Sequence, residues 1–201
     1  MTIQTAGLAF AVLVVFVICV PLLRTRRRWS YGRLLALAIF ATYLIAVAAL
    51  TLLPLRFDYA LVGRVASWEV IRGFINLTPG GYGMPQEQVV ANILLGVPFG
   101  FGLPFVWSMS ALKVIVLGMS FSICIEALQL LLDLTGLAAP ARSVDANDVI
   151  LNTLGVAIGV FFFIVVGAIY RRLFGRSDID FGLWSHFHRT LLRSGPNSAP
   201  S

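Results

Sequence analysis

The sequence predicts an all-α fold, a polytopic membrane bundle of five transmembrane helices followed by an amphipathic helix at the membrane interface near the C-terminus. Two observations support this prediction. Hydrophobic residues make up 59% of the 201 residues and charged residues only 12%, whereas soluble domains carry about a quarter charged residues. The hydrophobic residues form long runs with arginines beside them, where basic side chains meet anionic lipid. The net charge of +6 therefore does not indicate a nucleic-acid partner.

Several apolar segments are long enough to cross a membrane. A hydrocarbon core of about 30 Å requires about 20 apolar residues in an α-helix. The segments that meet this requirement are approximately 7–23, 34–55, 89–107, 111–134 and 149–170. The first of them has no charged residue, and arginines follow it rather than precede it, unlike the order in a signal peptide. We therefore expect it to be an uncleaved transmembrane helix.

Basic residues predict the orientation of these helices. The segment 24–33, RTRRRWSYGR, contains five arginines and no acidic residue, so we expect it in the cytoplasm. With alternating crossings, Arg171 and Arg172 after the last segment fall on the same side of the membrane. The loops 56–88 and 135–148 then lie outside. The sequence thus predicts an N-terminus outside the membrane and a C-terminus in the cytoplasm.

The tail segment 181–193, FGLWSHFHRTLLR, predicts an amphipathic helix on the inner leaflet. Arg189 and Arg193 lie on its polar face. Its apolar face, at helical spacing, comprises Phe181, Trp184, Phe187, Leu191 and Leu192. The segment also holds the only two histidines, His186 and His188, but it supplies too few ligands for a metal site. We predict no metal site and no cofactor.

Polar residues recur at helical spacing in three of the apolar segments. Inserting a charged side chain into the membrane centre costs about 2.5–3.5 kcal/mol, so such side chains should face protein or water. The three polar stripes are Gln88, Asn92, Gly96 and Gly100; Ser122, Glu126, Gln129 and Asp133; and Asp145, Asp148, Asn152, Gly155 and Gly159. Each stripe occupies one side of its helix.

The predicted orientation brings these stripes to a similar depth. Asn92 and Asn152 lie about one turn inside the outer boundary, and Glu126 lies about two turns inside it. The residues expected at the boundary itself are Asp133, Arg142, Asp145 and Asp148. We therefore expect a polar cavity that opens to the outer leaflet.

Structural explanations compete with this interpretation. Gly155 and Gly159 are four residues apart, a spacing that favours close helix packing over a role in a site. Asp148 is explained equally well as the N-terminal cap of its helix. Glu126 is harder to explain structurally, because a carboxylate within a membrane span is a costly way to join helices.

Four motifs between residues 76 and 169 resemble the VanZ-like family of bacterial membrane proteins. In order, they are INLTP, ANILLGVPFGFGLP, SICIEALQ and RSVDANDVILNTLG. The matching positions are Asn76, Pro79, Asn92, Pro98, Gly100, Ser122, Glu126, Gln129, Arg142, Asp145, Asp148, Asn152 and Gly155. The chain departs from the family at Gly80, where members often have an aromatic residue, and at Gly96, where they have a bulky one.

The resemblance implies a protein of the cell envelope in a bacterial plasma (inner) membrane. The family is named for a glycopeptide-resistance protein associated with reduced sensitivity to teicoplanin, but the resemblance implies no reaction. It divides the chain into an additional N-terminal helix and basic cytoplasmic loop (1–33), a VanZ-like membrane domain (34–170), and a cytoplasmic amphipathic helix with a disordered tail (171–201).

The first functional hypothesis is a non-enzymatic envelope protein that binds a membrane lipid, a lipid-linked envelope precursor or a lipoglycopeptide. In this hypothesis Arg142 contacts an anionic headgroup, while apolar residues such as Leu94, Phe99 and Phe101 accommodate an acyl chain. The predicted binding residues are Asn76, Asn92, Ser122, Glu126, Gln129, Arg142, Asp145, Asp148 and Asn152. The sequence does not indicate an oligomeric state.

Two alternatives remain open. In an intramembrane hydrolase or transferase, Glu126 would be the general base, and Asp145 and Asp148 would orient Arg142 or hold a divalent cation. Against this alternative, the chain has no plausible Ser–His pair and no phosphate-binding glycine loop. In a small transporter, a polar path should cross the bundle, but the inner halves of the spans lack ionisable residues. Whether the protein is an enzyme is left open.

Overall fold

The structure is a computed structural model that describes residues 29–52, 75–76, 85–134, 144–175 and 184–194. These residues form α2 (Tyr31–Leu52), β1 (Ile75–Asn76), α5 (Gln86–Val106), α6 (Ala111–Leu134), β2 (Val144–Asp145), α7 (Ala146–Phe174) and α8 (Ser185–Leu192). By length and composition, α2, α5, α6 and α7 can each cross a membrane. The prediction of a multi-pass helical protein is confirmed. The predicted span 7–23 lies outside the described residues, so the count of five spans stays a prediction.

The helix limits follow the apolar runs closely. α6 begins and ends where the sequence predicted, whereas α7 extends beyond the predicted segment 149–170 at both ends. Its start is fixed by Asp145, whose Oδ1 accepts a hydrogen bond of 2.8 Å from the backbone N–H of Asn147. Asp145 is therefore the N-terminal cap of α7. The alternative prediction that Asp148 is the cap is wrong, because Asp148 lies within the first turn.

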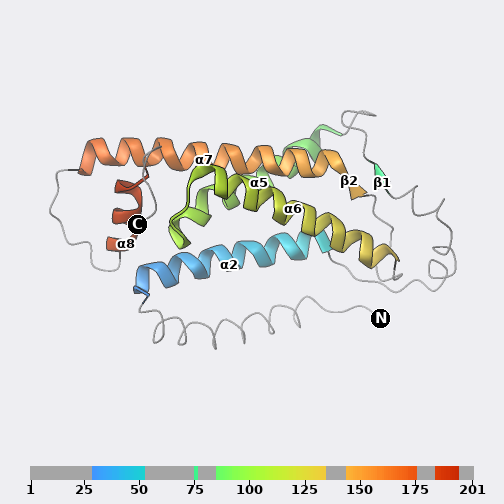
Figure 1. The fold of residues 1–201 in the computed structure, drawn as a ribbon, viewed down its shortest axis with the longest axis horizontal. Helices are drawn as coiled ribbons and strands as arrows, with labels where there is room; N and C mark the ends of the chain where they lie inside the picture. Colours follow the sequence, from blue (N-terminus) through green and yellow to red (C-terminus); the bar gives the residue numbers. More distant parts are fainter. Residues whose placement is uncertain (1–28, 53–74, 77–84, 135–143, 176–183, 195–201) are drawn as a thin grey trace.

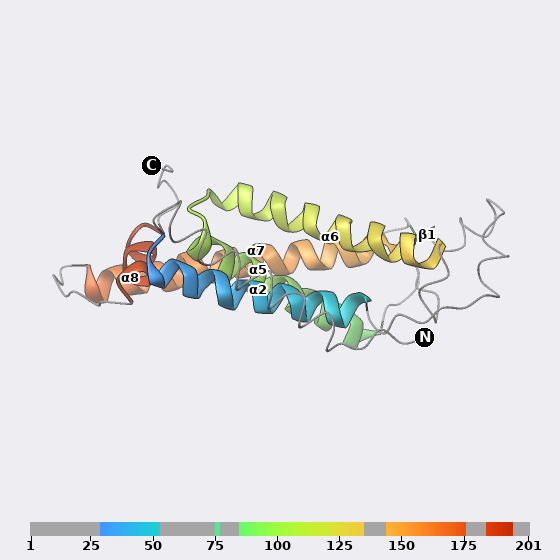
Figure 2. The ribbon, with the colours of Figure 1, turned by 90° about the horizontal axis from the view of Figure 1, so that it is seen from below.

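The four long helices form an elongated bundle in which each described long helix runs opposite to the next one along the chain (Figures 1 and 2). α5 and α7 run one way, and α2 and α6 run the other way. One end, here called the strand end, holds the first turns of α5 and α7, the last turn of α6 and the strands. There β1 and β2 form a parallel two-residue pair in which Asn76 lies opposite Asp145. The opposite end, here called the α8 end, holds α8 and the turn from α5 to α6.

Glycines lie in the contact between α5 and α7, which is the most extensive contact between any two described helices. A Cβ atom at Gly96 would overlap the backbone oxygen of Asn152, and one at Gly155 would overlap that of Ile93. Gly100 and Gly159 face the opposite helix in the same way, one turn further along. The predicted packing role of Gly155 is thus confirmed, since only small residues allow backbones this close.

Large apolar side chains cover the outer faces of the bundle. They are exposed on all four long helices and include Ile39, Leu50, Val90, Leu94, Leu117, Ile123, Leu128, Leu131, Ile150, Phe161 and Ile169. In water, an apolar surface of this extent would favour association or aggregation. In a membrane protein, lipid covers an apolar outer surface of this kind. The exposed apolar side chains therefore agree with the membrane spans indicated by the hydropathy of the helices.

An aromatic core fills the half of the bundle nearer the α8 end. Phe40 on α2 contacts Phe99 on α5 edge-on, with ring centroids 5.5 Å apart. Phe105 contacts Phe163 of α7 in the same way at 5.3 Å. All four rings are buried. Phe99, which the sequence suggested could accommodate an acyl chain, has its ring inside this core, where it also lines a small hollow. Its contact with an acyl chain stays a prediction.

α8 is amphipathic, as the sequence predicted, and covers Ser185–Leu192. Residues 181–183 of the predicted segment 181–193 lie outside the described residues. Its apolar residues Phe187 and Leu191 pack against the core. The Phe187 ring lies 5.5 Å from that of Phe105 on α5. The face that the sequence assigned to lipid is therefore covered in part by the bundle, and α8 closes one end of it (Figure 1).

Candidate functional site

Glu126 connects α6 to the beginning of α7 at the strand end. Its side chain is 5% exposed, and its Oε2 accepts a hydrogen bond of 3.1 Å from the backbone N–H of Asp145. Ser122 and Asp133, from the same predicted stripe, are also buried. The stripe on α6 therefore faces the bundle, which satisfies the expectation that a carboxylate in this helix avoids lipid.

Asp148 connects α7 to α5. Its Oδ1 accepts hydrogen bonds from the side-chain amides of Asn92 and Gln88, the second at 3.3 Å. Asp148 also lies in the first turn of α7, where the helix dipole stabilises negative charge. The stripes predicted on α5 and α7 thus meet at this carboxylate.

Asn152 lies one turn deeper on α7 and reaches α6. Its Nδ2 donates a hydrogen bond of 2.9 Å to Oγ of Ser122. Its Oδ1 is buried and accepts no hydrogen bond within the described part of the chain. A buried amide oxygen without a donor is uncommon, and it is a group that the donor of a bound ligand would satisfy.

Gln129 connects α6 to α2. Its Nε2 donates a hydrogen bond of 3.0 Å to the backbone oxygen of Thr51 on α2. Tyr43, also on α2, donates from its hydroxyl to the backbone oxygen of Leu95 on α5. These two bonds hold α2 against α5 and α6, and neither Tyr43 nor Thr51 was predicted from the sequence.

A cleft of about 570 Å³ lies among α2, α5, α6 and α7 at this level. This volume is within the range of sites for small molecules and cofactors. Polar groups on its wall belong to Tyr43, Thr51, Asn92, Glu126, Gln129, Asp148 and Asn152. Apolar groups belong to Ala46, Val47, Leu50, Ala91, Leu94, Leu95, Pro98 and Ile125. Five of the nine predicted binding residues therefore line one cleft, and Ser122 lines a small adjoining hollow.

The entrance of the cleft is apolar. Those of its lining residues that are exposed are Ala46, Leu50, Ala91, Leu94 and Pro98, all on α2 and α5. Leu50 is 72% exposed and Leu94 is 61% exposed. The carboxylate of Glu126, in contrast, is at the buried wall. The cleft thus opens sideways between α2 and α5, on the surface that lipid covers.

Two predicted binding residues cannot be placed by their side chains. Arg142 lies outside the described residues, and only the backbone of Asn76 is described. That backbone pairs with Asp145 in the β1–β2 register, so Ile75 and Asn76, the first two residues of the INLTP motif, run beside the residues that precede α7. Within the described ranges, no three residues among His, Cys, Asp and Glu converge as metal ligands.

Fold and site together define a class of protein, a multi-pass helical membrane protein with a cluster of carboxylates and amides between its helices at one end. A protein-family model described as VanZ/LLP1 matches residues 9–167. The chain belongs to this family, and the resemblance based on its motifs is confirmed. The match begins at residue 9, so it includes most of the predicted span 7–23. The four motifs all lie after this span. No curated protein and no solved structure matches the chain.

Proposed function

We propose that this protein binds a lipid-linked component of the bacterial cell envelope in the cleft at the strand end. In this proposal the chain crosses the plasma membrane five times, with its N-terminus outside, so the cleft belongs to the outer leaflet. The observation that carries the proposal is the combination of an apolar entrance between α2 and α5 with a polar inner wall. An amphiphile can enter such a site sideways from the bilayer.

The polar wall favours a headgroup rich in hydrogen-bond donors. Glu126 uses one carboxylate oxygen for Asp145, and Asp148 uses one for the amides of α5. The other oxygen of each carboxylate accepts no hydrogen bond from the described residues, and Oδ1 of Asn152 adds a further acceptor. Sugar hydroxyls supply donors of this kind, so we infer a glycolipid or a lipid-linked sugar.

The same wall is less suited to catalysis. Ser122, in the adjoining hollow, accepts a hydrogen bond from the amide of Asn152, and among the described residues no hydrogen bond joins its hydroxyl to a base. Transport is also disfavoured, because the aromatic core of Phe40, Phe99, Phe105 and Phe163 lies between the cleft and the α8 end. Of the three functions, binding of an amphiphile is therefore the one that the geometry of the cleft supports best. Reduced sensitivity to teicoplanin would follow if the bound component were the antibiotic's target or shielded that target.

Lipid retention tests the proposal. Full-length protein is extracted in its native membrane with a lipid-preserving polymer, and the retained lipids are identified by mass spectrometry. We expect wild type to retain a lipid with a hydroxyl-rich headgroup and Glu126→Gln to lose most of it. Gln keeps an acceptor oxygen for the Asp145 N–H, so the fold is preserved.

Glu87→Gln is the matched control, because Glu87 is exposed in the first turn of α5 and does not line the cleft. Equal retention in wild type, Glu126→Gln and Glu87→Gln would exclude the cleft as the lipid site. A lipid that is chemically altered by wild type, but not by Glu126→Gln, would instead favour the hydrolase or transferase alternative.

A further inference from the structure

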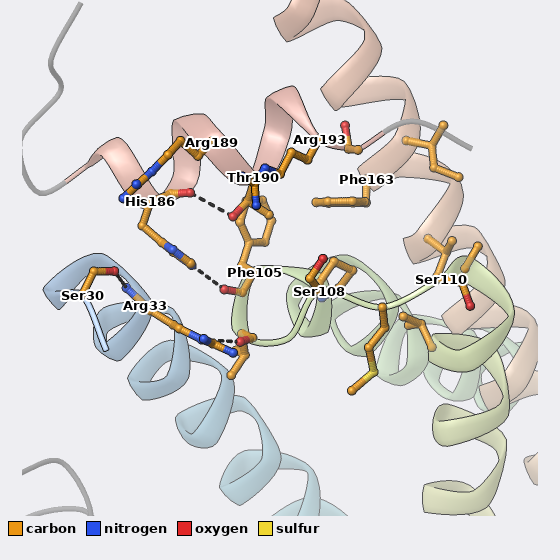
Figure 3. A pocket seen from close by; sticks show the side chains of 18 of the residues that line it. Ser30, Arg33, Phe105, Ser108, Ser110, Phe163, His186, Arg189, Thr190 and Arg193 are labelled. Carbon is orange, nitrogen blue, oxygen red and sulfur yellow. Dashed lines mark hydrogen bonds between the residues drawn. The ribbon is translucent and has the colours of Figure 1, made fainter. Parts of the chain in front are cut away.

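A second pocket, of about 370 Å³, lies at the α8 end (Figure 3). It is enclosed by the start of α2, the turn from α5 to α6, the inner face of α7, and α8. This pocket is separated from the cleft by the aromatic core, and its chemistry is different. Where the cleft has carboxylates, this pocket has cations.

Three arginines contribute to the pocket: Arg33 from α2, and Arg189 and Arg193 from α8 and its C-terminal end. Within the described ranges, its lining contains no Asp or Glu. Guanidinium groups around one hollow repel each other, so an anion placed between them would be stabilised by all of them. Hydroxyl groups of Ser108 and Ser110 add hydrogen-bond donors.

The framework of the pocket is held by specific contacts. Nε of Arg33 donates to the backbone oxygen of Val106 at 2.8 Å, and its guanidinium lies 4.0 Å from the ring centroid of Trp29. On the other side, Nη1 of Arg171 donates to Oγ of Ser194 at 2.7 Å and so fixes the end of α8 to α7. The cationic side chains are therefore presented by fixed elements rather than by a loose tail.

The position of the pocket indicates a membrane surface. Trp29 and Trp107 contact each other edge-on at 6.3 Å beside it, and Trp184 at the start of α8 is 58% exposed. Tryptophan is enriched where helices leave the hydrocarbon layer. The pocket also has an apolar wall, which includes Val114 and Phe163. Cations beside an apolar wall at headgroup depth match a phospholipid better than a soluble anion.

We propose that this pocket binds the phosphate group of an anionic phospholipid, with Arg189 and Arg193 in contact with the phosphate. The site is independent of the cleft at the strand end and of the function proposed for it. It would join α8 to the membrane surface through a specific lipid rather than through its apolar face alone.

Titration of the full-length protein in neutral detergent tests this site. The probes are dioctanoyl phosphatidic acid and, separately, inorganic phosphate, and the readout is tryptophan fluorescence, because Trp29 lines the pocket. We expect saturable binding of the lipid and much weaker binding of inorganic phosphate. Replacing both Arg189 and Arg193 by Gln should raise Kd about tenfold or more.

Arg172→Gln is the matched control, since Arg172 is an exposed arginine of α7 near the same end and does not line the pocket. Its Kd should stay near that of wild type, and the double replacement by Lys should retain most of the binding. Equal losses in the Gln variant and in Arg172→Gln would overturn the proposal in favour of diffuse attraction. Equal losses in the Lys and Gln variants would overturn the role of charge. Inorganic phosphate that binds as tightly as the lipid would overturn the lipid as the occupant.

Discussion

The carboxylate of Glu126, about two turns before the end of α6, accepts a hydrogen bond from the backbone N–H of Asp145, 19 residues further along the chain. Asp145 in turn caps α7 through the N–H of Asn147. One buried acid thus fixes the position at which the next helix begins. This relationship gives Glu126 a structural role beside the ligand-binding role proposed for it, and the two roles can be separated by mutation.

Replacing Glu126 by Ala should destabilise the protein by about 1–3 kcal/mol, because it leaves the Asp145 N–H without its acceptor. Glu126→Gln should cost less than half as much, since the amide oxygen can accept the same bond. The free energy of unfolding is measured by denaturation in mixed detergent micelles. Equal destabilisation by Ala and Gln would show that the charge, and not the acceptor, matters.

Asn92 and Asp148 should be energetically coupled across α5 and α7, because the amide donates to the carboxylate. A double-mutant cycle with Asn92→Ala and Asp148→Ala should give a coupling free energy of about 0.5–2 kcal/mol. The control cycle pairs Asn92→Ala with Thr153→Ala, because the Thr153 hydroxyl donates to the backbone oxygen of Val149 in its own helix. A coupling near zero in the first cycle would exclude a stabilising contact.

Helical periodicity explains how much of this site could be predicted from the sequence. Polar residues spaced by three and four in an apolar helix must share a face, and the cost of burying them in lipid turns that face toward protein. This reasoning placed Asn92, Glu126, Asp148 and Asn152 on facing surfaces. It also yielded the limits of α6, since those limits coincide with an abrupt change in hydropathy.

Contacts to backbone atoms could not be predicted in this way. The backbone oxygen of Thr51 accepts a hydrogen bond from the side-chain amide of Gln129, and the backbone oxygen of Leu95 accepts one from the hydroxyl of Tyr43. Every residue has a backbone carbonyl group, so the sequence does not indicate which of them accepts a hydrogen bond from a side chain. α2 therefore appeared as a plain apolar span, although it forms one side of the cleft.

The docking of α8 was missed for a related reason. An amphipathic pattern identifies an apolar face but does not distinguish lipid from protein as the surface that covers it. The pocket at the α8 end was missed because Arg33 and Arg189 are far apart in sequence. Each of them is explained locally as a residue beside a span, and only the fold brings them together.

Gly155→Leu should separate α5 from α7 and destabilise the bundle by about 2 kcal/mol or more, because a side chain there meets the backbone of Ile93. A leucine at Ala127, which is exposed on α6, should change stability by less than about 0.5 kcal/mol. Thermal unfolding in detergent compares the two variants. A tolerated leucine at Gly155 would contradict the close approach of the two helices.

The docking of α8 should weaken in acid, because His186 is held in a site that disfavours its charged form. Burial lowers the pKa of His186 below its ordinary value, and the guanidinium groups of Arg33 and Arg189 lower it further. The hydrogen bond of 2.6 Å between its Nε2 and the backbone oxygen of Phe105 on α5 offsets part of this effect. Since the pKa is lower when α8 is docked, the undocked state binds more protons between the two pKa values.

Docking should therefore be fully stable above the ordinary histidine pKa of about 6.5 and should be lost progressively as the pH falls through the lower pKa of the docked state. Amide hydrogen exchange of α8 at pH 7.5 and pH 5, corrected for the intrinsic exchange rate, measures this change. His186→Gln keeps a side-chain N–H donor for Phe105 but cannot gain a proton, so its α8 should show the same protection at both pH values. Equal acid sensitivity in wild type and His186→Gln would assign the effect to another group.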